Sequence, residues 1–192
     1  MKYFSVFFLV FLFSANLHAQ FTTNVYWTEQ SGMPASEVIY YNPSKNLQWP
    51  DFKGASNTGG IVAAITMSGF GYKASMKNNG SNGQLNIGVY CYFNKDKSWV
   101  KLDKKTGYIL NHEQHHFDIS FIAATIFAGK IRNAVLTAGN SNAQLQSIYK
   151  ECCDLMNKLQ DDYDGQTRNG QVKEVQQKWN DYLDKKLAMV TK

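Results

Sequence analysis

The chain has 192 residues, a formal net charge of +5 and a hydrophobic fraction of 44%. This length suits a single domain with a sizeable core. The lysines are scattered and form no block of positive charge, so the composition argues against a nucleic-acid partner.

The first 19 residues have the pattern of a secretory signal peptide. Lys2 precedes an apolar run, which small or polar residues follow up to Ala19. Such a leader is removed after export, here before Gln20, and its apolar run is shorter than the roughly 20 residues of a membrane span. No cysteine lies near the cleavage point for lipid attachment. The sequence therefore predicts a secreted or periplasmic domain of residues 20–192, without stable membrane insertion.

Strands and turns are expected in the first half of this domain. Residues 61–76 and 84–93 are rich in β-branched and aromatic side chains, and the sequence KNNGSNG between them favours a turn. Together they predict a long antiparallel hairpin, whose second strand alternates apolar residues from Leu85 to Phe93 and so presents one face to a core. The segment LQWPDFKG at 47–54 contains a proline that disfavours a central strand, and we expect a packed loop there.

Helices are expected in the second half. Residues 106–131 contain no proline, and residues 140–160 carry apolar side chains at helical spacing. A third amphipathic helix follows the segment DDYDGQTRNG at 161–170, which reads as a turn. This order predicts an α+β fold, in which an N-terminal, mostly antiparallel sheet is followed by three helices packed on one of its faces.

Three cysteines, Cys91, Cys152 and Cys153, belong to this exported domain. An oxidising compartment permits Cys91 to pair with either of the other two, leaving one free thiol. Adjacent cysteines lack the two-residue spacer of a common zinc or redox motif. We expect the cysteines to pack in the core with at most one disulfide. Whether Cys91 would pair with Cys152 or with Cys153 stays open.

The stretch LNHEQHHFDIS at 110–120 contains every histidine outside the leader. On a helix, His112 and His116 lie one turn apart on the same face and can share a metal ion. With Glu113 they form the H-E-x-x-H arrangement of zinc peptidases, in which the glutamate takes a proton from the attacking water. The surrounding residues are apolar almost all round, so a buried, zincin-like active-site helix is predicted.

The sequence does not define the third ligand of the predicted zinc ion. His115 and Asp118 point away from the predicted metal and, being three residues apart, can pair with each other. A catalytic zinc ion has three protein ligands, and no histidine follows His116. The remaining ligand is therefore expected to be a carboxylate or an amide, or else no third ligand exists. The acidic candidates stay unranked: Glu151, Asp154, Asp161, Asp162 and Asp164.

Five stretches together resemble the bacterial family catalogued as domain of unknown function 922, described as predicted secreted zinc-dependent proteases. They are LQWPDFKG, AAITMSGFGY, KSWVK, LNHEQHHFDIS and YDGQTRNGQVKEVQQKWN, and they span nearly the whole mature chain. The resemblance implies that His112 and His116 bind Zn²⁺ and that Glu113 is the base. It also brings a turn at Tyr163 and Asp164 into the site.

One position departs from the family pattern, which often has a histidine where this chain has Asn169. Asp164 can then substitute as third ligand, with Asn169 as an amide alternative. The Tyr163 hydroxyl is a candidate for stabilising an oxyanion, and aromatic packing is its other role.

The sequence as a whole favours a secreted zinc metallopeptidase that cuts peptides or proteins. The strand at 84–93 is expected to border the cleft and align an extended substrate. The alternative, motivated by Asn169, is a weak or inactive family member that acts as an envelope or extracellular binding module.

Overall fold

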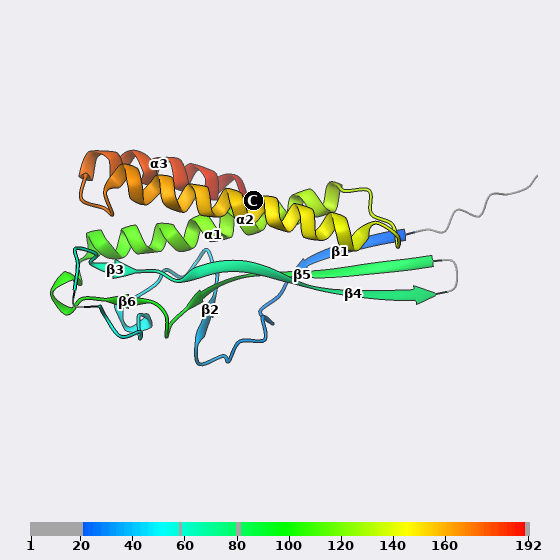
Figure 1. Ribbon diagram of the computed structural model, residues 1–192, viewed down its shortest axis with the longest axis horizontal. Helices are drawn as coiled ribbons and strands as arrows, with labels where there is room; N and C mark the ends of the chain where they lie inside the picture. The colour runs from blue at the N-terminus through cyan, green and yellow to red at the C-terminus, as the bar shows by residue number, and fades with distance from the viewer. Residues whose placement is uncertain (1–20, 58, 80–81, 191–192) are drawn as a thin grey trace, which may run out of the picture.

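Strands and helices occupy separate layers in the computed structural model, which describes residues 21–190 except 58 and 80–81 (Figure 1). The leader predicted for residues 1–19 lies outside the described residues, as does the tip of the predicted hairpin turn. Among the described residues, no helix is long and apolar enough to cross a membrane.

The predicted hairpin is the centre of the larger sheet. Its strands are Ser68–Asn79 (β4) and Asn82–Asn94 (β5), which pair antiparallel along their whole length. On the other side, β5 pairs in parallel with Phe21–Trp27 (β1) and antiparallel with Val38–Tyr40 (β2). The sheet is therefore mixed, and β5 has a neighbour on each edge.

The first hairpin strand begins at Ser68, later than the predicted residue 61. The preceding residues leave the hairpin, and Ala64–Ile65 (β3) pairs instead with Trp99–Val100 (β6) in a separate two-stranded sheet. Glycines and small residues around position 60 permit this change of direction. The short sheet lies beside the N-terminal half of the first long helix (Figure 1).

The three predicted helices are Gly107–Asn133 (α1), Ser141–Thr167 (α2) and Lys173–Val190 (α3). Helix α1 begins where the Thr106 hydroxyl accepts a hydrogen bond from the Ile109 amide, a typical N-cap. It packs on the sheet on one side and on α2 and α3 on the other (Figure 1). This central position explains why α1 is apolar almost all round, and the α+β fold with helices after the sheet is confirmed.

Helix α2 is longer than its sequence suggests. Residues 161–167, predicted as a turn, form its last two turns, and the chain reverses only at Arg168, Asn169 and Gly170, all with positive φ. The prediction was wrong because polar residues and Gly165 resemble a loop, whereas the buried Tyr163 and Thr167 hold the helix against its neighbours. Tyr163 and Asp164 therefore project from a rigid helix.

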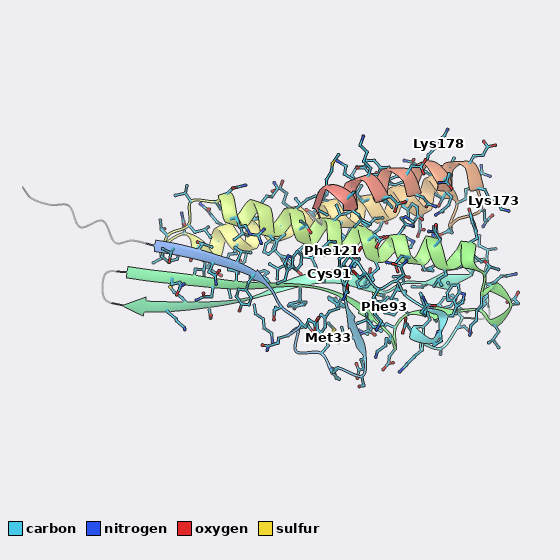
Figure 2. All side chains as sticks on the ribbon, turned by 180° about the vertical axis from the view of Figure 1, so that it is seen from behind. Met33, Cys91, Phe93, Phe121, Lys173 and Lys178 are labelled. Atoms are coloured by element: carbon cyan, nitrogen blue, oxygen red, sulfur yellow. The ribbon has the colours of Figure 1, made fainter. Side chains whose placement is uncertain are left out.

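The main core lies between β5 and α1. The alternation predicted for β5 is confirmed: Leu85, Ile87, Val89, Cys91 and Phe93 are all buried. Figure 2 shows Cys91 and Phe93 on the strand facing the side of α1 that carries Phe121. Phe93 also contacts Phe117 of α1, with ring centroids 5.9 Å apart, so the sheet fixes the helix that carries the histidines.

No disulfide joins the three cysteines. All three are free, with Cys91 and Cys152 buried in the main core and Cys153 partly buried beside it. Burial in apolar packing accounts for these side chains without a covalent link. The expected core packing is therefore confirmed, and the bridge that the sequence permits is not formed.

The segment at 47–54 is the packed loop that its sequence predicts. It contains one turn of 3-10 helix, Trp49–Asp51, and buries Leu47 and Phe52 in the core. The Leu47 amide donates a hydrogen bond to the Gln114 side chain on α1 (2.8 Å). A second 3-10 turn, Leu102–Lys104, leads into α1.

Candidate metal centre

Three ligand atoms converge where α1 meets the end of α2. The Nε2 atoms of His112 and His116 lie 3.2 Å apart, and each is 3.0 Å from Oδ1 of Asp164. Both imidazoles are buried, whereas the Asp164 side chain is partly open to solvent. The helical extension of α2 is what brings Asp164 to the two histidines.

The other nitrogen of each imidazole is held by a glutamine. His112 Nδ1 lies 2.8 Å from Oε1 of Gln176 on α3, and His116 Nδ1 contacts Oε1 of Gln160 on α2. A carbonyl oxygen can only accept, so both Nδ1 atoms carry the proton and donate it. An imidazole that is neutral and protonated on Nδ1 has its lone pair on Nε2, which is the form that binds a metal ion.

This set of atoms fits a metal ion by distance and by chemistry. Tetrahedral ligands about 2.0–2.1 Å from Zn²⁺ are separated from one another by about 3.3 Å. The three observed separations are 3.0, 3.0 and 3.2 Å. Two imidazoles and a carboxylate are typical zinc ligands, and three converging lone pairs call for a cation between them.

The electrostatics of the cluster also favour positive charge. Burial raises the pKa of Asp164, but hydrogen bonds and charge from His112 and His116 outweigh it and hold the pKa well below its usual range. Burial lowers the pKa of His116, yet the hydrogen bond to Asp164 and the nearby carboxylates bring it above its ordinary value. The cluster thus stabilises a carboxylate and a cation at the same place.

Glu113 lines the same cavity as His112, His116 and Asp164 but is not one of the three residues whose ligand atoms converge. Its side chain is buried, and its Oε2 atom has no hydrogen-bond partner among the described residues. Burial raises the pKa of Glu113, and the charges of His116 and His112 partly offset the increase. The buried Oε2 atom needs a polar partner, and a water in the adjacent cavity can supply one.

The cavity has a volume of about 640 Å³, and His112, Glu113, His116 and Asp164 all line it. Its opposite wall is the segment at 61–66, which includes β3, and not β5. The prediction that strand 84–93 borders the cleft was wrong, because β5 has strands on both edges.

One edge of β3 faces β6, and no described strand pairs with the other. The Ala63 carbonyl accepts a hydrogen bond from the Lys101 amide (2.9 Å) on the β6 side. Since backbone groups alternate between the two edges of a strand, those of Ala64 point away from β6. Ala64 also lines the cavity.

Tyr163 packs against the site from behind. It is fully buried, its ring stacks on His112 with centroids 4.6 Å apart, and its hydroxyl contacts the Gln176 amide nitrogen. It is not among the residues that line the cavity. This geometry favours the packing role over the predicted contact with an oxyanion.

The turn after α2 completes the wall of the site. Thr167 donates to the Tyr163 carbonyl (2.7 Å) and accepts from the Gly170 amide (3.1 Å). A Cβ at Gly170 would lie 3.4 Å from His112 Nδ1, and its φ of +76° favours glycine. Asn169 lines the cavity, and its backbone amide donates to the Asp164 carbonyl.

The other acidic candidates lie elsewhere. Glu151 pairs with Lys130, Asp154 with Lys150 and Asp162 with Lys158, and these pairs are largely exposed. Of the acidic candidates, Asp164 is the one grouped with the two histidines.

His115 and Asp118 do not pair with each other as predicted. His115 Nδ1 donates to the Asn111 carbonyl (2.7 Å), and its Nε2 is 3.5 Å from Asp184 on α3. Asp118 instead accepts from Tyr41 (2.9 Å) and Gln114 (2.8 Å). Both side chains support the packing of α1 and lie outside the cavity lining.

Sequence reasoning missed the two glutamines. Gln160 precedes Asp164 by one helical turn and so shares its face of α2. Gln176 is in phase with Trp179 and the buried Leu183, so the apolar stripe of α3 predicts its burial. A glutamine within the apolar stripe of an amphipathic helix is therefore the sequence feature that could have identified Gln176.

Comparisons of the chain with family models, with curated proteins and with solved structures find no match. The function of this site is therefore inferred from its geometry.

Proposed function

We propose that the protein is a zinc-dependent metallopeptidase that hydrolyses peptide bonds in an extended peptide or protein segment. The observation that carries this proposal is the convergence of His112 Nε2, His116 Nε2 and Asp164 Oδ1, with both Nδ1 atoms engaged by glutamines. Three protein ligands leave a zinc ion one open position, as in catalytic sites.

The chain's own groups suit this reaction. When bound, Zn²⁺ polarises a carbonyl and acidifies a water molecule. Glu113 takes a proton from the attacking water and later passes it to the leaving amine, so the carboxylate is regenerated. Its raised pKa brings it closer to neutral pH, where a base of this kind is effective.

The cavity suits an extended chain. The free edge of β3 offers backbone groups to a peptide lying beside it, in the manner of an added strand. Ile61 and Ile65 are exposed large apolar residues of the cavity wall. They favour segments with apolar side chains near the bond that is cut.

The substitution Glu113→Gln separates catalysis from metal binding. We expect the variant to bind zinc as the wild type does and to cut an unstructured protein substrate about 10²–10⁴-fold more slowly, since the amide cannot take the proton. Zinc content and peptide release are measured on the same preparations. Equal rates in the two proteins would contradict the proposal, whereas zinc binding without cleavage by the wild type would favour the binding-module alternative.

A further inference from the structure

Two glutamines from different helices hold the back of the metal centre. Gln176 of α3 is fully buried, and its Oε1 lies 2.8 Å from Nδ1 of His112. Gln160 of α2 makes the equivalent contact with Nδ1 of His116. Neither glutamine is one of the three converging ligands, yet each fixes one of them.

The orientation of the Gln176 amide is set by a chain of hydrogen bonds. Its Nε2 donates to Oδ1 of Asn180 (2.9 Å), one turn further along α3. The Asn180 amide nitrogen in turn donates to Oδ1 of Asn111 (2.8 Å), the residue before His112. Because the nitrogen of Gln176 has its own acceptor, the oxygen must be the atom that faces His112.

Gln160 is fixed by the residue that it orients. Its Nε2 donates to the backbone carbonyl of His116 (2.9 Å), with Ser120 Oγ further away at 3.4 Å. The amide therefore bridges the backbone and the imidazole of one residue. Its oxygen faces His116 Nδ1, and the ring cannot rotate without breaking this contact.

We infer that Gln176 and Gln160 are positioning residues that select the Nδ1–H form of both histidines and thereby set the affinity of the site for zinc. This inference rests on the proposed zinc site. A protonated Nε2 cannot bind a metal, so the form of the imidazole decides whether three lone pairs converge. A neutral amide accepts the N–H bond without adding negative charge beside Asp164.

The substitution Gln176→Leu tests this role by removing the acceptor at similar volume. We expect zinc affinity, measured by competition with a chromophoric chelator, to fall about 10–100-fold, as is usual when a partner of a ligating histidine is lost. Gln177→Leu is the matched control, because Gln177 is on the same helix and bonds only to Asp181 at the surface among the described residues. Gln176→Glu keeps an acceptor and should restore the affinity to within a few-fold of the wild type.

A second readout does not depend on bound metal. In metal-free wild-type protein at pH 8, the ¹⁵N chemical shifts of His112 should identify Nδ1 as the protonated nitrogen, and Gln176→Leu should shift the ring toward the Nε2–H form. Nε2 protonation of His112 in the wild type would overturn the inference even if the variant fails to fold. Unchanged zinc affinity in folded Gln176→Leu would also overturn the inferred positioning role, while leaving the proposed peptidase function intact. Absence of zinc binding by the wild type would overturn both the positioning role and the proposed function.

Discussion

Asp164 would set the charge of the proposed metal centre. Two neutral imidazoles and one carboxylate give a bound Zn²⁺ a net charge of +1, which favours an open position that takes water or a carbonyl oxygen. The position of Asp164, 3.0 Å from both Nε2 atoms, would allow it to act as the third ligand of the proposed site without further movement. Asn169, which lines the same cavity, is available to contact substrate.

Replacing Asp164 with alanine should weaken zinc binding by more than about 100-fold, since loss of a ligand exceeds the usual 10–100-fold effect of losing an orienting partner. Asp154→Ala is the matched control on the same helix, because Asp154 pairs with Lys150 at the surface. Zinc titration with a competing chelator measures the zinc affinity of both variants. An unchanged affinity in Asp164→Ala would assign the third ligand to another residue.

Part of this site is predictable from local spacing alone. His112, Glu113 and His116 follow from a pattern within one helix, since helical geometry fixes their relative directions. Asp164 could not be separated from the other acidic residues, because its distance to the histidines depends on how α2 packs against α1. The same holds for Gln160 and Gln176, whose partners lie 44 and 64 residues away in the chain.

The end of α2 is the element that brings Asp164 to the two histidines. The sequence DDYDGQTRNG contains the residues of a turn, but turn residues within it, Gly165 among them, are helical in the fold. Local propensity is weak compared with the burial of Tyr163 and Thr167 against α1 and α3. The chain reverses direction only at Arg168, Asn169 and Gly170, which have positive φ.

Gly165→Ala tests this extension of α2. A Cβ at Gly165 would meet no atom within 4 Å, and alanine favours a helix over glycine. We expect the free energy of unfolding to increase by up to about 1 kcal/mol in urea denaturation. Gly170→Ala is the comparison: its φ of +76° is unfavourable for alanine, and stability should fall by about 1 kcal/mol. A loss of stability in Gly165→Ala would argue for a turn at this position.

Helix α1 joins the sheet to the other two helices. Its C-terminal half buries Phe127 and Ile131 in the main core, while its N-terminal half places His112 and His116 in the lining of the cavity. The order of strands and helices was predictable, because strands and helices differ in the period at which hydrophobic residues recur. The pairing of β3 with β6 was not, since two-residue strands carry no periodic signal.

The same packing predicts three free thiols. Burial raises the pKa of Cys152 to about 11, and burial also places the pKa of Cys91 well above its ordinary value. At pH 8 the native protein should therefore react slowly with a thiol reagent at these two positions. After denaturation without reductant, all three cysteines should react; a count of one would indicate the disulfide that the sequence permits.

We propose that His112, His116 and Asp164 form one zinc site. The most direct measurement is the zinc content of the untagged protein after equilibration with Zn²⁺ and dialysis, compared with a variant carrying His112→Ala and His116→Ala. We predict about one zinc ion per chain in the wild type and none retained by the folded variant. A wild type without bound zinc, or a variant that retains it equally, would contradict the claim.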